Sequence, residues 1–373
     1  MLRSIRSWVL ATAMLPSFSA LAQGEKVTIA KTGVQLRVEG VGVHKRAGDS
    51  APTDSQSLVI RNARILVTGN LSEAISYTLR LDVKNALYSS ENVGQDTSIA
   101  ALDRAYVEQH VLPWLALKVG RMPLMSGAIE ADYSSMDRYY ESYFGELVSY
   151  QVAPITTGID LSATTSTHTF SLQVFNGVQE TTGVNKGLQQ AADLSTAVGY
   201  RGSLFGGMIK PIVSYNQFVR IRGGKGSQRD DTTKFRAGGV GAQFSVAGAD
   251  LDLEYDVFRK PGFRFYTWDG AGVARAIDNP QDELRTVVTQ LAYFDSQTHL
   301  RPFVKWSQDR NKMAGEERRN YVRYAYGVEY RPLPKGFRYH AVVVDQQDSD
   351  RLTNASRVTT ASRKYILGLA AKI

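Results

Sequence analysis

The chain has 373 residues, a formal net charge of +8, a mean hydropathy of -0.24 and no cysteine. The lack of cysteine excludes disulfide bonds, thiol catalysis and cysteine-based zinc sites. After residue 22 no segment approaches the roughly 20 apolar residues of a transmembrane helix, which excludes a helical bundle in a membrane but not a β-barrel.

The N-terminus has the three parts of a secretory signal. Arg3 and Arg6 precede an apolar run from Trp8 to Leu15, and the small-residue motif ALA follows at 20–22. This pattern predicts a signal peptide over residues 1–22, cleaved before Gln23. We expect residues 23–373 to form one exported domain. In that compartment a basic charge does not point to nucleic acid, and we expect no nucleic-acid partner.

Polar and apolar residues alternate along most of the chain. Residues 76–85 read SYTLRLDVKN, so Tyr77, Leu79 and Leu81 share one face of a strand, and Arg80 and Asp82 share the other. The same pattern recurs at 34–39, 62–67, 251–257, 301–307, 321–331 and 365–373. The predicted connections alternate between short (69–72, 112–113, 296–298 and 332–336) and long (46–57, 86–98, 222–234 and 259–283).

This arrangement predicts an all-β fold, a transmembrane antiparallel barrel of about 16 strands with short turns on one rim and long loops on the other. The alternative is a soluble sheet protein, which at this size needs a second apolar layer and strands that are apolar on both faces. The polar face instead stays charged in strand after strand. We therefore expect the apolar face to meet outer-membrane lipid and lipopolysaccharide, and the polar face to line a channel.

Residues 124–152 are the longest early departure from alternation. They follow the fifth predicted strand (115–121) and carry five acidic residues and one arginine, a net charge of -4. Six aromatic residues favour packing over disorder, so we expect this third loop to fold back into the lumen and form a constriction. The expected constriction residues are Glu130, Asp132, Asp137, Arg138, Tyr140, Glu141 and Glu146.

Three short motifs resemble a known family. LDRAYVE (102–108), KVGRMPL (118–124) and VFNG (174–177) resemble the phosphate-selective porin O and P family, and NARI (62–65) resembles its arginine-rich second strand. The resemblance runs from about residue 30 to the C-terminus. It implies a 16-stranded, trimeric outer-membrane channel with a narrowing third loop. It also implies lumenal arginines and constriction lysines in phosphate-selective members, whereas residues 124–152 contain no lysine.

If the polar face lines a channel, basic residues form much of its wall. Opposite an acidic loop they create a transverse field that orients dipolar solutes, and the net sign sets ion preference. The alternative is that these cations only pair with carboxylates on neighbouring strands. By the same alternation, Arg61 belongs to the outward, lipid-facing side of its strand. The candidate pore-lining residues are Arg37, Arg64, Arg80, Lys84, Arg104, Lys118, Lys305 and Arg323.

The sequence thus predicts a passive outer-membrane porin that passes small hydrophilic solutes and ions with a mild anion preference, and the family resemblance implies a homotrimer. Two alternatives stay open: a substrate-specific channel for phosphate or another anion, and a non-transport barrel such as an enzyme or adhesin. We expect no catalytic residue and no cofactor, because the five histidines form no recognisable motif with serine and an acid. We expect no metal site either, because Arg301, Lys305 or Arg323 should neutralise the carboxylates of residues 252, 254 and 256.

Overall fold

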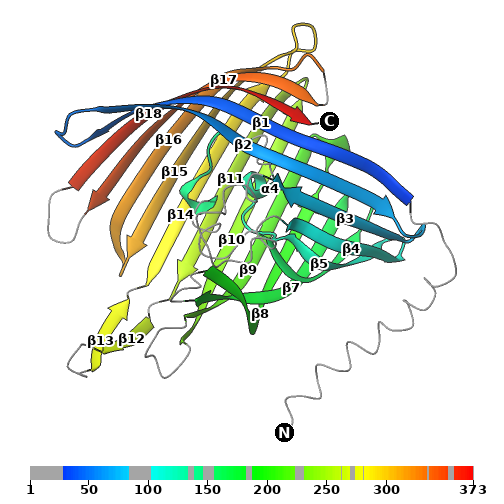
Figure 1. The fold of residues 1–373 in the computed structure, drawn as a ribbon, viewed down its shortest axis with the longest axis horizontal. Helices are drawn as coiled ribbons and strands as arrows, with labels where there is room; N and C mark the ends of the chain where they lie inside the picture. Colours follow the sequence, from blue (N-terminus) through cyan, green and yellow to red (C-terminus); the bar gives the residue numbers. More distant parts are fainter. Residues whose placement is uncertain are drawn as a thin grey trace.

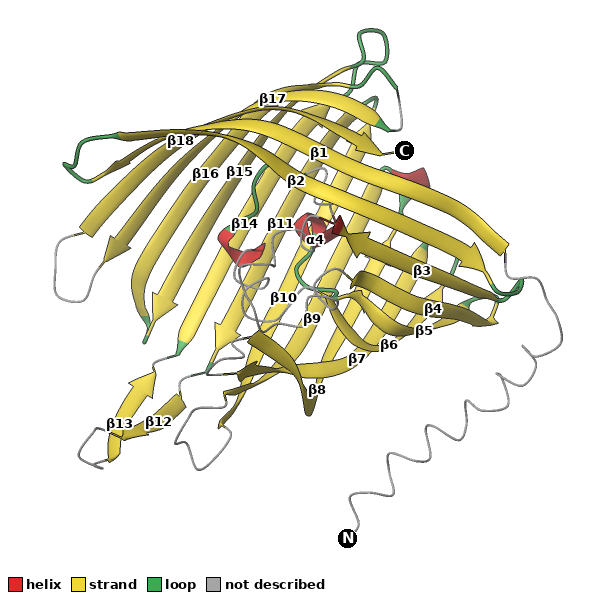
Figure 2. Cartoon of the chain, viewed as in Figure 1, coloured by secondary structure: helices red, strands yellow, loops and turns green. Residues whose placement is uncertain are grey.

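The computed structural model describes residues 28–83, 102–132, 138–145, 155–181, 187–222, 231–261, 263–268, 274–279, 281–333, 336–351 and 357–372. They form a closed antiparallel barrel of 16 strands, which confirms the predicted fold (Figure 1). Neighbouring strands follow chain order, and β1 closes the ring by pairing with β18. Strands make up nearly all of the wall, and helices are few and short (Figure 2).

The bounds of the elements are as follows. The barrel strands are β1 (Thr28–Ala47), β2 (Thr53–Asn70), β3 (Ile75–Asp82), β4 (Leu102–Leu112), β5 (Leu115–Pro123), β6 (Ile155–Thr164), β7 (His168–Thr181), β8 (Gly187–Gly202), β9 (Ile209–Arg222), β10 (Asp231–Val246), β11 (Ala249–Lys260), β14 (Asp282–Tyr293), β15 (Leu300–Met313), β16 (Glu316–Tyr330), β17 (Phe337–Arg351) and β18 (Arg357–Lys372). A separate hairpin consists of β12 (Phe263–Trp268) and β13 (Ala274–Asn279). The short helices are α4 (Ile129–Asp132) and η3 (Phe205–Gly207).

The connections differ in length between the two rims. The rim that holds the start of β1 and the end of β18 has short connections, such as 113–114 and 165–167. The opposite rim holds the long ones, such as 83–101, 124–154 and 261–281, beside short turns such as 314–315. In outer-membrane barrels the rim with long loops faces the cell exterior.

Two predicted loops differ from the structure. The expected loop at 46–57 is a short turn, because β1 and β2 extend through Ala47 and Thr53 and pair almost to their ends. The expected loop at 259–283 contains the β12–β13 hairpin. At 53–57 backbone pairing continues through polar residues that alternation alone places in a loop, whereas the hairpin joins two short segments, 263–268 and 274–279.

The two faces of each strand have different environments. On β1, Arg37 and Glu39 are buried, whereas Val34 and Leu36 are exposed. A closed barrel has only an interior and an outside, so the buried polar face points inwards and the exposed apolar face points outwards. On β3 Arg80 is likewise buried, as predicted. Among the described residues, no helix has the length and apolar character needed to cross a bilayer.

Close packing between β4 and β5 depends on Gly120. Its φ is +132°, and a Cβ built there overlaps the carbonyl oxygen of Ala105 and lies 2.8 Å from Cα of Tyr106. We expect Gly120→Ala to destabilise the barrel by about 1–3 kcal/mol, because neither backbone can move without breaking the strand pair. The midpoint of the heat-induced shift on unboiled gels measures this loss. Gly42→Ala is the control, because a Cβ there meets nothing within 4 Å, and equal midpoints for the two variants would contradict the prediction.

Candidate functional site

The connection between β5 and β6 contacts strands that lie far along the chain. Glu254 on β11 accepts hydrogen bonds from the backbone nitrogens of Ala128 (2.9 Å) and Glu130 (2.7 Å), where α4 begins. Asp309 on β15 accepts one from the backbone nitrogen of Tyr143 at 3.1 Å. Both carboxylates belong to the buried, interior face of their strands. We call the described parts of this connection, residues 124–132 and 138–145, the inner loop.

Glu130 links the inner loop to the wall through its charge. Its carboxylate accepts a hydrogen bond from Nζ of Lys305 at 2.5 Å and from the backbone nitrogen of Ser142 at 3.0 Å. Burial favours a raised pKa for Glu130, but the charge of Lys305 and the hydrogen bonds from Ser142 outweigh burial and lower that pKa. Glu130 and Lys305 therefore form a buried ion pair.

Tyr139 fills a pocket built from the first strand of the barrel and from two strands near the end of the chain. Its hydroxyl donates to Oε1 of Glu329 on β16 at 2.6 Å, and its ring stacks on Phe303 of β15 with centroids 5.1 Å apart. The guanidinium carbon of Arg37 on β1 lies 4.8 Å from the ring centroid, and Arg37 donates to the carbonyl of Arg138 at 2.7 Å. Sequence reasoning did not include Tyr139 among the site residues, although the aromatic doublet at 139–140 marks the place.

The predicted basic residues fall into two groups. The first group contacts the inner loop: Arg37, Lys305 and Arg323, the last of which donates to the carbonyl of Glu141. The second lies on β2, β3, β4 and β5: Arg64, Arg80, Arg104 and Lys118. Lys84 lies outside the described residues. The structure therefore does not gather these cations into one continuous wall.

Arg64, Arg80 and Lys118 of the second group lie beside carboxylates. Nε of Arg64 is 3.1 Å from Asp82 and 3.6 Å from Asp103, and Arg80 also pairs with Asp103. A register shift between β3 and β4 pairs Arg80 with Arg104 and then Leu81 with Leu102, which leaves Asp103 as an extra residue in a bulge. In a regular strand the neighbouring residues Asp103 and Arg104 would face opposite sides. The bulge brings Asp103 into contact with Arg64 and Arg80 while Arg104 faces the interior hollow.

A second bulge changes the position of Arg61. The register between β1 and β2 shifts after Arg37, so Arg61 has no partner residue in the ladder. Its Nε donates to Oε2 of the buried Glu39 at 2.9 Å. The outward position that strict alternation predicts for Arg61 is therefore wrong, because a bulge interrupts the period of two.

The predicted constriction residues are not all in contact. Glu130 binds Lys305, and Nζ of Lys305 lies 4.4 Å from the ring centroid of Tyr140. Arg138 and Glu141 form an ion pair with 2.7 Å between nitrogen and oxygen. Asp132 is the last residue of α4, whereas Asp137 and Glu146 lie outside the described residues.

The expected neutralisation of the β11 carboxylates is wrong for Glu254. Glu254 accepts backbone hydrogen bonds of the inner loop. Arg301 lies 3.5 Å from Glu329, and Lys305 pairs with Glu130. The inner loop supplies partners for both signs of charge, which strand alternation cannot indicate.

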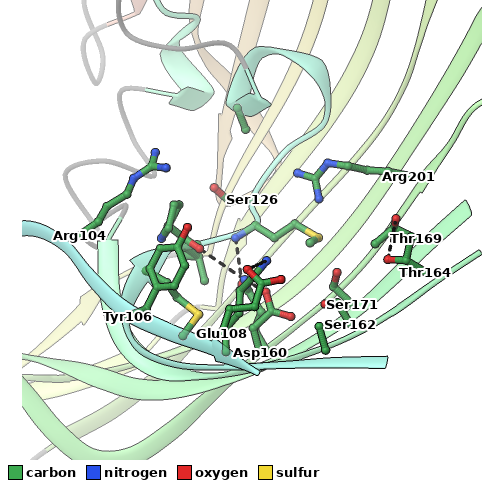
Figure 3. Close-up of a pocket in the computed structure, with 18 of the residues that line it drawn as sticks. Arg104, Tyr106, Glu108, Ser126, Asp160, Ser162, Thr164, Thr169, Ser171 and Arg201 are labelled. Atoms are coloured by element: carbon green, nitrogen blue, oxygen red, sulfur yellow. Dashed lines mark hydrogen bonds and ion pairs between the residues drawn. The ribbon is translucent and has the colours of Figure 1, made fainter. Parts of the chain in front are cut away.

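A hollow of about 620 Å³ lies between the inner loop and the wall from β4 to β8 (Figure 3). The hydroxyls of Thr164 and Thr169 lie 3.2 Å apart on this wall, and Lys118 lies 3.6 Å from Glu108. Cations, hydroxyls and the carboxylates of Glu108 and Asp160 share the lining, which suits hydrated, hydrogen-bonding solutes. The lining includes Arg104, Lys118, Ser162, Thr164, Thr169, Ser171 and Arg201.

Comparisons with known proteins give a family match over part of the chain. The family model "Phosphate-selective porin O and P" matches residues 35–202. No curated protein matches the chain.

Solved structures of outer-membrane barrels are similar to the chain in fold. An anion-selective porin from Comamonas acidovorans has a TM-score of 0.62 at 9% identity, over 93% of this chain and 100% of that one. The outer membrane channel DcaP of Acinetobacter baumannii has a TM-score of 0.58 at 10% identity, over 90% and 96%. OmpT of Vibrio cholerae has a TM-score of 0.57 at 12% identity, over 94% and 99%.

Proposed function

We propose that this outer-membrane porin, a member of the phosphate-selective porin O and P family, is a passive channel for small hydrophilic solutes and ions with a mild anion preference. The pairing of interior cations with carboxylates on β2, β3 and β4 carries the proposal. Arg64 and Arg80 both lie beside Asp103, and Arg64 also lies beside Asp82. Because these carboxylates offset much of the positive charge on the wall, the net electric field in the pore is weak. Such a field biases the passage of ions without binding one kind tightly.

In this proposal residues 124–152 form the loop that narrows the pore. The contacts of the inner loop with interior residues of β1, β11, β15 and β16 support this role. The hollow beside β4 to β8 is then the remaining passage, and its serine and threonine hydroxyls replace part of a solute's hydration.

A substrate-specific channel for phosphate or another anion is the second candidate. The observation in its favour is that Arg104, Lys118 and Arg201 line the same hollow. Inorganic phosphate carries up to two charges near neutral pH, so in this candidate the three cations hold it longer than chloride, against the opposing charges of Glu108 and Asp160 in the same lining.

Planar-bilayer recordings test both candidates. Under a KCl gradient, we expect a reversal potential of the sign given by moderate chloride preference, and only weak block of the chloride current by millimolar phosphate. Block by micromolar phosphate would favour the substrate-specific channel. A reversal potential of the opposite sign would contradict the anion preference, and a folded protein without conductance would contradict a porin.

We further propose that residues 1–22 are removed on export, that residues 23–373 form the mature protein, and that it assembles as a homotrimer in contact with lipopolysaccharide. A related fold, OmpT of Vibrio cholerae, is described in a trimer form. We propose a channel without enzymatic activity, which the match to a porin family model and the similarity to a porin fold support. N-terminal sequencing of the outer-membrane protein and light scattering of the detergent-solubilised form test the cleavage site and the trimer.

A further inference from the structure

Four arginines face outwards at the long-loop end of four neighbouring strands. Arg236, Arg259, Arg285 and Arg310 lie on β10, β11, β14 and β15, and all four are exposed. We call them the outer arginine patch. On each strand the patch residue lies nearer to the long-loop rim than an exposed apolar residue of the same outward face: Val240 on β10, Tyr255 on β11, Val287 on β14 and Val304 on β15.

The strand register sets these arginines in two cross-strand pairs. Arg236 is directly opposite Arg259, and Arg285 is directly opposite Arg310. Like charges directly opposite each other destabilise a sheet. Each pair therefore gains stability when an anion lies between its two guanidinium groups.

One carboxylate lies between the two pairs. Glu283 accepts hydrogen bonds from Nε of Arg259 at 2.8 Å and from Nε of Arg285 at 2.6 Å. In the part of the chain that the structure describes, it is the one acidic side chain recorded in an ion pair with the patch. Four positive charges and one negative charge leave a net charge of +3. The side chains of Arg259 and Arg285 remain 54% and 49% exposed, so they stay open to a ligand.

The patch lies at the height of the outer-leaflet headgroups. The rim with long loops faces the cell exterior, and the apolar outer face ends where the arginines begin. Elsewhere on the outer face a comparable arginine is paired: Nε of Arg363 on β18 lies 2.6 Å from Asp345 on β17. The excess charge is therefore a property of the patch and not of every outward arginine.

We propose that the outer arginine patch binds a lipopolysaccharide molecule of the outer leaflet through two phosphate groups, one at each arginine pair. Guanidinium groups bind phosphate oxygens in a bidentate manner. Residues directly opposite on paired strands have Cβ atoms only about 4.5–5.5 Å apart, so both members of a pair reach the same phosphate. A phospholipid with one phosphate satisfies only one pair. This inference rests on the proposed place of the protein in the outer membrane, in contact with lipopolysaccharide, and not on the selectivity of the pore.

Native mass spectrometry of the detergent-solubilised protein with bisphosphorylated lipid A, in the presence of EDTA, tests the proposal. The variant combines Arg236→Gln, Arg259→Gln, Arg285→Gln and Arg310→Gln. An arginine near an anionic surface contributes about 1 kcal/mol, which is about fivefold in affinity, so we expect the combined variant to bind at least about tenfold more weakly. Arg363→Gln is the matched control, because this arginine is outward-facing and 51% exposed but lies outside the patch and pairs with Asp345, whereas the patch arginines share the single carboxylate of Glu283.

Two further lipids separate the sources of phosphate. We expect lipid A without phosphates and phosphatidylglycerol to bind the wild-type protein much more weakly than bisphosphorylated lipid A. Phosphatidylglycerol binding as tight as that of lipid A would overturn the two-phosphate site. Equal binding of lipid A by the wild type and the combined variant, or an equal loss in Arg363→Gln, would overturn the patch.

The heat-induced gel shift and single-channel conductance establish that each variant is folded. If the combined variant does not fold, the pair variants R236Q/R259Q and R285Q/R310Q replace it. Each pair variant should lose affinity for lipid A. If either of them binds lipid A as tightly as the wild-type protein does, the assignment of one phosphate to each pair is overturned. Pairwise replacement by lysine should restore part of the affinity, because lysine keeps the charge but not the bidentate geometry.

Discussion

Lys305→Met is expected to raise single-channel conductance severalfold and to make the open current noisier. The substitution leaves the carboxylate of Glu130 buried without the ammonium group that lies 2.5 Å away. Removing one member of a buried ion pair typically costs about 3–5 kcal/mol, and here the inner loop can avoid that cost by leaving the wall. Single-channel recording in 1 M KCl measures the change, because surface charges are screened there and conductance reflects pore width.

The matched control is the double variant Glu130→Gln with Lys305→Met. It removes both charges, and the glutamine oxygen can still accept a hydrogen bond from the backbone nitrogen of Ser142. We expect its conductance to lie closer to the wild type than to Lys305→Met, since replacing both partners of a buried pair costs less than removing one. If Lys305→Met conducts like the wild type, the ion pair does not hold the inner loop against the wall.

Neutralising the cations on β2 and β3 and neutralising the carboxylates on β3 and β4 should shift the ion selectivity in opposite directions. Arg64→Gln with Arg80→Gln leaves Asp82 and Asp103 without these partners, so we expect the reversal potential to move towards cation preference. Asp82→Asn with Asp103→Asn should move it towards stronger anion preference. Recordings in a KCl gradient near 0.1 M measure both shifts, because the Debye length there is about 10 Å.

Arg363→Gln is the control for selectivity, because this arginine lies on the outer face and not in the pore. It should leave the reversal potential unchanged. Shifts of the same sign in both interior double variants would mean that altered pore shape, and not charge, sets the preference. Folding of each variant is checked by the heat-induced gel shift.

The sequence was sufficient to predict which face of most strands points inwards. SYTLRLDVKN illustrates this, because the buried position of Arg80 and the exposed apolar residues on other strands follow from alternation alone. The prediction fails at bulges. Arg61 and Asp103 both lie next to register shifts, and one extra residue in a strand moves a side chain to the other face without a clear signal in the sequence.

The partners of the inner loop could not be predicted from the sequence. Tyr139 and Glu329 are 190 residues apart, and Ala128 and Glu254 are 126 residues apart. Such pairs depend on how the whole barrel closes and on the height at which the loop crosses each strand. Alternation identified Lys305 as an interior residue, but it could not distinguish a cation that faces solutes from one that binds Glu130.

The pocket of Tyr139 has a consequence for the order of assembly. It combines Arg37 from β1 with Phe303 from β15 and Glu329 from β16, and these strands lie on both sides of the seam where β1 meets β18. The pocket cannot exist until the last strand has joined the first. Docking of Tyr139 is therefore a late event in biogenesis, and a barrel still open at its seam leaves the inner loop without its aromatic anchor.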